Sequence, residues 1–213
     1  MKRLIYLSVF LFLSALACST TSIAASLVPS GGVLYQDYFS DPKSGWGEMN
    51  KPAGQTGYIK DTYHIFVNKP DTNIWTHPGK DYSDVRLEVS LLPVSGTLSN
   101  RMGLICRLKD DKNFYFFVIS ADGFYGIGKV KAGQATLLSG SEMLPSESIL
   151  TGNQINQVRA DCAGDKLSFY ANGKLLASVN DKDFSSGDVG ILAGTFDLPN
   201  TDVYFDNFVA YKP

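Results

Sequence analysis

The sequence contains little glutamate and very little histidine, and both shortages argue against common hydrolytic sites. It has two histidines, and only four of its 21 acidic residues are glutamates. Cleavage of a glycosidic bond uses two carboxyl groups that flank the bond. Glu88 has no second acid nearby on its face, and Glu142 and Glu147 fall in a long loop. Neither His64 nor His77 sits in a nucleophile motif, so we expect no two-carboxylate glycosidase and no catalytic triad.

Other motifs that mark cofactor or nucleic-acid sites are missing as well. The chain has no glycine-rich phosphate loop and no Cys/His spacing typical of a metal site. Its 19 basic and 21 acidic residues form no basic patch, so we expect no nucleic-acid partner and no required cofactor. No convincing amphipathic helix appears, and a composition rich in Asp, Asn and Gly but poor in Glu favours turns over helices.

The first residues have the three parts of a secretory signal. Lys2 and Arg3 precede an almost wholly apolar stretch at 4–13, and small residues follow up to Cys18. The apolar stretch is too short to span a bilayer, which takes about 20 residues. The segment 15–18 (Ala-Leu-Ala-Cys) resembles the lipobox of bacterial lipoproteins, which predicts lipidation of Cys18 after removal of residues 1–17. The alternative is an ordinary A-x-A cleavage site, with cleavage after Ala17 or further on near Ser22-Ile23-Ala24.

A flexible tether and one domain are expected after the signal. Residues 18–32 are small and polar, with a proline and two glycines near the end, as in a spacer. Residues 33–213 have the length of a single domain with a substantial core. The protein is therefore expected to be exported, either as an envelope lipoprotein bound to the membrane by its lipid or as a secreted protein.

The chain has three cysteines, which is an odd number for an exported protein. Lipidation of Cys18 and one disulfide between Cys106 and Cys162 would account for all three. The alternative is that Cys106 and Cys162 are two buried free thiols. An oxidising compartment favours the disulfide.

Short strand-like runs separated by turn signals at spacings of about 8–12 residues predict an all-β sandwich. Hairpin turns are expected at Asp61-Thr62, 109–112, Gly164-Asp165 and Asn172-Gly173, of which Asn-Gly is the strongest signal. The segment 113–120 is apolar on both faces, so this strand is expected either to be covered twice or to line a recess.

Several segments resemble the concanavalin A-like lectin/glucanase superfamily, and they span nearly all of the chain after Gly32. The resemblance lies in Asp37–Trp46, Gly57–Val67, Asp110–Lys129, Gly164–Asp181, Ser186–Phe196 and Val203–Pro213. The pattern is similar to exported jelly-roll domains described as of unknown function or as keto-disaccharide-hydrolase-like. The resemblance implies a two-sheet antiparallel jelly-roll sandwich with one concave sheet, on which carbohydrate often binds in this superfamily.

Carbohydrate binding would need exposed aromatic side chains with polar neighbours. The candidate aromatic residues are Trp75, Tyr58, Tyr125 and Phe116, and the candidate hydrogen-bonding residues are Arg107, Asn113 and Asp122. The alternative for each aromatic residue is packing in the sandwich, since aromatics dominate cores. Trp75 is the favoured ligand contact, because its strand is half polar.

A structural calcium ion is a further expectation. Asp206 lies in the terminal strand, where an acid is costly unless it is paired or ligated. The resemblance implies a Ca²⁺ site at such a position, with Asp37 as partner. The alternative is that Asp206 only forms hydrogen bonds in a loop.

Three functions remain open from the sequence. The first is a non-catalytic, exported β-sandwich that binds carbohydrate or another cell-surface ligand. The second is a glycan hydrolase that uses the concave face, with a recess around Arg107 and Phe116. The third is an envelope structural or protein-interaction module. A deep recess lined by aromatic and polar groups favours the first two, and a flat or plugged sheet favours the third.

Overall fold

The computed structural model describes residues 31–213, and these residues form a sandwich of β-strands without any helix. No helix long and apolar enough to cross a membrane is found within that range. The signal predicted at 1–17, the lipidation of Cys18 and all but the last two residues of the tether lie outside the described residues.

The first sheet, sheet A, has nine antiparallel strands within residues 31–213. The path is β15-β14-β13-β7-β17-β4-β3-β2, and β1 pairs with β17 beside it. The strands are β1 (Val33–Asp37), β2 (Met49–Lys51), β3 (Gly54–Ile59), β4 (Thr62–Val67), β7 (Val85–Ser95), β13 (Asn156–Ala163), β14 (Lys166–Ala171), β15 (Lys174–Asn180) and β17 (Thr201–Tyr211).

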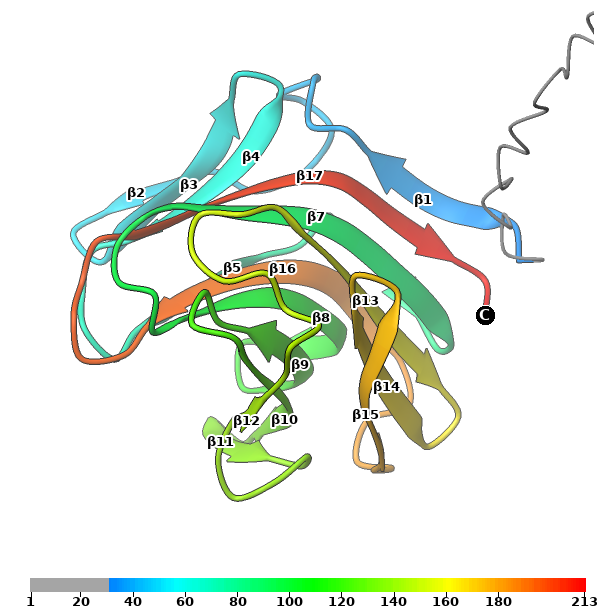
Figure 1. Cartoon of the computed structure of the whole chain (residues 1–213). Helices are drawn as coiled ribbons and strands as arrows, with labels where there is room; N and C mark the ends of the chain where they lie inside the picture. The colour runs from blue at the N-terminus through cyan, green and yellow to red at the C-terminus, as the bar shows by residue number, and fades with distance from the viewer. Residues whose placement is uncertain (1–30) are drawn as a thin grey trace, which may run out of the picture.

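The second sheet, sheet B, has eight strands in the described part of the chain and lies beneath sheet A in Figure 1. The path is β11-β10-β9-β8-β16-β5, with β12 paired to β10 and β6 paired to β16. The strands are β5 (Asn73–Thr76), β6 (Asp81–Tyr82), β8 (Asn100–Asp110), β9 (Asn113–Ile119), β10 (Phe124–Lys131), β11 (Gln134–Leu137), β12 (Leu144–Pro145) and β16 (Gly187–Thr195). The expected all-β fold of two antiparallel sheets is confirmed.

The main core lies between the two sheets. In β7 and β17 buried and half-exposed residues alternate, as expected when one face of a sheet meets a core and the other meets water. Leu87 and Phe205 from sheet A and Leu104 and Phe117 from sheet B are all completely buried in this cluster. Burial of each such side chain contributes about 1.5–3 kcal/mol.

Sheet B differs from sheet A because its central strands are buried on both faces. In β8 and β16 almost every residue is buried, including the residues that point away from sheet A. Ile105, Phe114, Val118 and Leu192 form a second, smaller apolar cluster on that outer face. The segment 113–120 is therefore apolar on both faces because one face packs in the main core and the other contributes to this second cluster. The outer face is the one described below as a candidate site.

The predicted hairpins form, with one shift in position. Lys60 and Asp61, rather than Asp61 and Thr62, have positive φ and form the turn between β3 and β4. Asn172 and Gly173 have φ values of 50° and 79° and join β14 to β15, as the Asn-Gly signal predicts. The long loop expected after residue 138 contains the short strand β12.

The predicted disulfide is present and joins the two sheets. Cys106 on β8 and Cys162 on β13 are bonded across the core, and both are fully buried. Each cysteine lies on the inward face of its strand, as the alternation of the sequence predicts. The bond closes a loop with a sequence separation of 56 residues, so it restricts the unfolded chain strongly.

Arg107 requires a correction, because the sequence places it in a ligand-binding recess and the structure buries it. Arg107 has a φ of 54° at an irregularity in the pairing of β8 with both neighbours, and such a bulge redirects a side chain. The side chain is 2% exposed. Its guanidinium donates to the carbonyls of Ser83, Phe184 and Gly164 at 2.8–2.9 Å and to Oδ1 of Asp84 at 3.2 Å. Arg107 therefore holds three loops together at one end of the sandwich.

Replacing both bonded cysteines by alanine is expected to lower the free energy of unfolding by about 2 to 4 kcal/mol, since the unfolded chain regains the entropy of a long loop. Urea denaturation followed by tryptophan fluorescence measures this loss. Wild-type protein under reducing conditions should match the Cys106→Ala/Cys162→Ala variant. An unchanged denaturation midpoint in the double variant would contradict a stabilising role of the bond.

Replacing Arg107 by methionine is expected to lower the free energy of unfolding by about 3 kcal/mol or more, because buried carbonyl groups lose their donors. The matched control is Arg159→Met, which removes a half-exposed arginine paired with Asp161 on the outer face of sheet A, and about 1 kcal/mol or less is expected for it. Thermal and urea unfolding compare the two variants. Equal losses would show that Arg107 does not anchor the loops.

Candidate functional site

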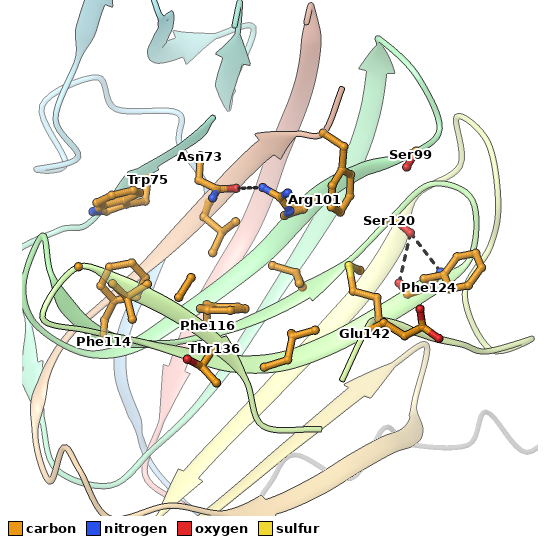
Figure 2. Close-up of a pocket in the computed structure, with 18 of the residues that line it drawn as sticks. Asn73, Trp75, Ser99, Arg101, Phe114, Phe116, Ser120, Phe124, Thr136 and Glu142 are labelled. Carbon is orange, nitrogen blue, oxygen red and sulfur yellow. Dashed lines mark hydrogen bonds between the residues drawn. The ribbon is translucent and has the colours of Figure 1, made fainter. Parts of the chain in front are cut away.

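The outer face of sheet B carries a groove with a volume of about 780 Å³ (Figure 2). Aromatic and aliphatic residues form most of the lining, and polar and charged residues lie among them. The apolar lining includes Trp75, Phe114, Phe116, Val118, Phe124, Val130, Leu137, Met143, Leu192 and Phe196; the polar lining includes Asn73, Ser99, Arg101, Asp111, Ser120, Asp122, Thr136 and Glu142. A concave apolar site with a few polar groups is the usual form of a small-molecule site.

The alternation of β9 places side chains into the groove and into the core in turn. Phe114, Phe116 and Val118 line the groove, while Tyr115 and Phe117 between them are completely buried in the main core. Trp75 on β5 faces the same side, with its ring centroid 5.2 Å from that of Phe114. The groove is therefore lined by Trp75 from the edge strand β5 and by the phenylalanines of β9, which lies inside the sheet.

Glycines occupy outward positions of sheet B where neighbouring atoms approach closely. One row of cross-strand neighbours runs from Trp75 through Leu192, Gly103 and Val118 to Gly126. A Cβ atom at Gly103 would overlap the carbonyl oxygen of Phe117, and one at Gly126 would lie 2.9 Å from Cδ2 of Leu137. Glycine at these two positions therefore allows the neighbouring strand and the Leu137 side chain to come close.

The Phe116 ring packs over Gly128. The two residues are direct partners across β9 and β10, and a Cβ atom at Gly128 would overlap Cζ of Phe116. The ring therefore lies over the glycine, an arrangement in which an aromatic residue covers the backbone that glycine leaves bare. The half-exposed ring of Phe116 consequently presents a flat apolar surface to the groove.

The segment between β11 and β12 forms one wall. The backbone N–H of Leu138 donates to the carbonyl of Ile127 at 2.7 Å, and Oγ of Ser139 accepts from the backbone N–H of Ile127 at 3.0 Å. These bonds fix the start of the segment to β10. Met143 then packs against the outer apolar cluster and lines the groove. The sequence predicts a loop for this segment and gives no sign that it takes part in the site.

Arg101 and Asn73 form part of the opposite wall. Arg101 is not among the binding residues that the sequence predicts. Nη1 of Arg101 donates to Oδ1 of Asn73 at 2.8 Å, as Figure 2 shows. The guanidinium carbon lies 3.8 Å from the ring centroid of Phe196. Burial lowers the pKa of Arg101 from its usual value, because the charged form is desolvated.

Three carboxylates lie in the lining, and two of them come from segments near Phe124. Figure 2 places Glu142 beside Phe124 and Ser120, on a different part of the groove from Arg101. Oγ of Ser120 donates to Oδ1 of Asp122. The third carboxylate belongs to Asp111 in the turn between β8 and β9. The groove is therefore polar at its rim and apolar at its floor.

Three of the predicted binding residues line this groove, namely Trp75, Phe116 and Asp122. The remaining ones lie elsewhere. Arg107 is among the buried loops described above. Asn113 faces its own turn, where Nδ2 donates to Oδ1 of Asp110 at 2.9 Å and Oδ1 accepts from the N–H of Ala132 at 3.0 Å.

Two tyrosines predicted as ligand contacts have packing roles in the structure. Tyr125 is 9% exposed and belongs to the main core. Tyr58 lies on β3 of sheet A, where its hydroxyl accepts from the N–H of Trp46 at 3.1 Å and its ring packs against Tyr63. The alternation of residues did not show which sheet a strand joins, and it did not separate inward from outward aromatics in these two segments.

The carboxylate of Asp37, a predicted calcium ligand, is occupied by protein donors. It accepts from the N–H of Phe39 at 2.7 Å, Nε1 of Trp46 at 2.9 Å and the hydroxyl of Tyr35 at 3.0 Å. Oδ1 of Asp206 accepts from the N–H of Asn207 at 2.6 Å. Residues 31–213 contain no group of three or more His, Cys, Asp or Glu side chains placed to hold a metal ion. The structural Ca²⁺ stays a prediction that the structure does not test.

No protein-family model matches the sequence, and no curated protein sequence is similar to it at a significant level. Solved structures do show the fold. The carbohydrate-binding module CBM66 from Bacillus subtilis superposes with a TM-score of 0.64 at 20% identity, over 79% of this chain and 96% of that one. A protein of unknown function with a galectin-like fold from Bacillus subtilis gives a TM-score of 0.63 at 14% identity, over 85% and 96%.

A β-glucanase from Bacillus licheniformis is also similar, with a TM-score of 0.59 at 9% identity over 86% of this chain and 99% of that one. These identities are low, so the likeness concerns the fold alone. Together with the two antiparallel sheets, it confirms the jelly-roll sandwich of concanavalin A-like type that the sequence resemblance implies.

Proposed function

We propose that this protein binds carbohydrate in the groove on the outer face of sheet B. The observation that carries the proposal is the groove itself, in which half-exposed Trp75 and Phe116 lie over an apolar floor with polar groups around them. The apolar face of a sugar ring stacks on an aromatic side chain, and its hydroxyls need hydrogen-bond partners at the edge. Asn73, Ser99 and Thr136 supply such partners.

The similar structures support the same class of ligand. One is a carbohydrate-binding module and another is a β-glucanase, and the groove lies on a sheet face of a fold that they share. A flat or plugged sheet, as expected for a purely structural module, does not agree with the groove of about 780 Å³ on this face. We therefore rank carbohydrate binding above a structural role.

Hydrolysis of the bound glycan is a second candidate, and one observation favours it. Asp122 and Glu142 both line the groove, and a glycosidase needs two carboxyl groups on opposite sides of the scissile bond. Neither acid belongs to a paired motif on one strand. Binding without catalysis is accordingly the primary proposal.

We further propose that the protein acts outside the cytoplasm, bound to a membrane by a lipid on Cys18. The sequence of residues 1–18 supports this location. The buried Cys106–Cys162 disulfide agrees with an oxidising compartment. Two acyl chains on one cysteine give stable anchoring without a transmembrane helix.

Substitution of either groove aromatic is expected to weaken glycan binding by about tenfold, the loss typical of a central contact residue. The variants are Trp75→Ala and Phe116→Ala, and the measurements are a glycan array followed by affinity electrophoresis of the mature protein. The matched control is Tyr204→Ala, a half-exposed aromatic on the outer face of sheet A, which should bind as wild type does. If both Trp75→Ala and Phe116→Ala bind the glycan as tightly as wild type does, the glycan does not bind in the groove.

Incubation of the protein with the glycans that it binds distinguishes binding alone from hydrolysis. Chromatography of the glycan after long incubation is expected to show no new reducing ends. If products appear, Asp122→Asn and Glu142→Gln should abolish them while binding persists, because the general acid and its partner carboxylate are then missing. Products that form with wild type and disappear in these two variants would show that the protein is a glycan hydrolase and not only a binding protein.

Mass spectrometry of the mature N-terminus tests the lipid anchor. The expected N-terminal residue is Cys18 with attached acyl chains, and Cys18→Ser should release the protein from the membrane fraction, because the acyl chains supply the anchoring. Free amines at Ala25 or Ser26, or an unmodified Cys18, would contradict the lipoprotein proposal and leave ordinary secretion.

A further inference from the structure

Arg101 stands apart from the other arginines of the described chain. Among residues 31–213, Arg86, Arg107 and Arg159 each lie within 4.0 Å of a carboxylate, whereas Arg101 has no such partner in that range. Asp71 attracts its charge through space without forming an ion pair. Arg101 therefore carries a positive charge inside the lining of the groove without an ion-pair partner among residues 31–213.

The position of the Arg101 side chain is fixed by two contacts. Nη1 donates to Oδ1 of Asn73 at 2.8 Å, and the guanidinium stacks on Phe196 with 3.8 Å between Cζ and the ring centroid. Gly194 is the direct cross-strand neighbour of both Arg101 and Asn73, so no side chain comes between them. Stacking covers the face of the guanidinium and leaves N–H groups at its edge, where they can donate in the plane.

An uncompensated charge in a partly desolvated place costs free energy, so its presence in a cleft points to a ligand. Burial acts on this group as well, since it lowers the pKa of Arg101 from its usual value. A guanidinium edge matches a carboxylate with two parallel hydrogen bonds. Neutral sugar hydroxyls would satisfy its hydrogen bonds but would leave its charge uncompensated.

We propose that the glycan bound in the groove carries a carboxylate, as in a hexuronic acid, and that Arg101 receives this carboxylate beside Trp75. This inference rests on the proposed carbohydrate binding and narrows its ligand to acidic saccharides. Glu142 and Asp122 lie on the Phe124 side of the groove, where they repel a second negative charge. The preferred ligand therefore has a uronate flanked by neutral sugars rather than a uronate at every position.

Isothermal titration calorimetry with paired oligosaccharides tests the proposal on the mature protein. The probes are glucuronoxylan and hyaluronan fragments, in which neutral sugars flank each uronate, and the same fragments with carboxyl groups reduced to hydroxymethyl groups. Polygalacturonate fragments carry a uronate at every position, and κ-carrageenan fragments carry sulfate instead. At least one isolated-uronate probe is expected to bind about tenfold or more tightly than its reduced counterpart and than polygalacturonate.

Variants of Arg101 assign the effect to this side chain. Arg101→Gln should remove the difference in affinity between acidic and reduced probes. Arg101→Lys should retain only part of this difference, because lysine cannot offer two parallel N–H donors. Arg159→Gln on sheet A is the matched control and should behave as wild type. The melting temperature of Arg101→Gln should fall no more than that of Arg159→Gln, since each variant removes one hydrogen-bonded arginine that stacks on an aromatic ring. This comparison separates a binding role of Arg101 from a structural one.

The outcomes distinguish this inference from the broader proposal. If wild type binds acidic and reduced probes equally, or binds only neutral glycans, the acidic-ligand inference is wrong and carbohydrate binding stands. If sulfated probes bind best, the carboxylate assignment is wrong. If no glycan of the array or of this panel binds, both proposals fail.

Discussion

The central strands of sheet B are apolar on both faces, and the groove exists because the two faces are covered differently. Sheet A covers the inner face, where side chains such as Leu104 and Phe117 pack completely. Within residues 31–213, no second sheet lies over the outer face of β8, β9 and β16, and its own aromatics and Met143 shield Ile105 and Leu192. Water would otherwise meet a continuous apolar surface, which is unfavourable in proportion to its area.

Glycines let strands and side chains approach closely on this face. A Cβ atom at Gly128 would overlap Cζ of Phe116, and one at Gly103 would overlap the carbonyl oxygen of Phe117. At Gly126 the side chains of Leu137 and Met143 lie where a Cβ atom would meet them. The side chains of Phe116, Leu137 and Met143, which line the groove, therefore depend on these glycines, and their placement needs a rigid backbone.

The Cys106–Cys162 bond and Arg107 provide that rigidity from adjacent positions of one strand. Cys106 points inward and bonds to β13 of sheet A. Arg107 follows at the bulge and fixes the loops at the end of the sandwich through four donated hydrogen bonds. Two neighbouring residues of β8 thus attach the strand to the opposite sheet and to three loops.

Strand alternation and turn residues predict the all-β sandwich and most of its hairpins, because these signals act locally. The family resemblance implies the two sheets, and the cysteine count together with an oxidising compartment favours the disulfide. The sequence predicts Trp75, Phe116 and Asp122 as lining residues but misplaces Arg107, because a bulge breaks the alternation that the prediction assumes. It also misplaces Tyr58, because membership of a sheet depends on pairing between distant strands. The segment 113–120, which is apolar on both faces, is the sequence signal that points to the groove.

For the proposed carbohydrate ligand, the floor and the walls of the groove would contribute different parts of recognition. Aromatic and aliphatic groups on the floor would attract any apolar sugar face and distinguish little between sugars. Selectivity would then come from the polar groups on the walls, whose unpaired donors and acceptors penalise a ligand that does not match them. Within residues 31–213, Arg101 is the one lining residue that carries a positive charge. In this proposal, the wall that contains Arg101 and Asn73 decides the identity of the ligand, while the floor sets how firmly a sugar is held.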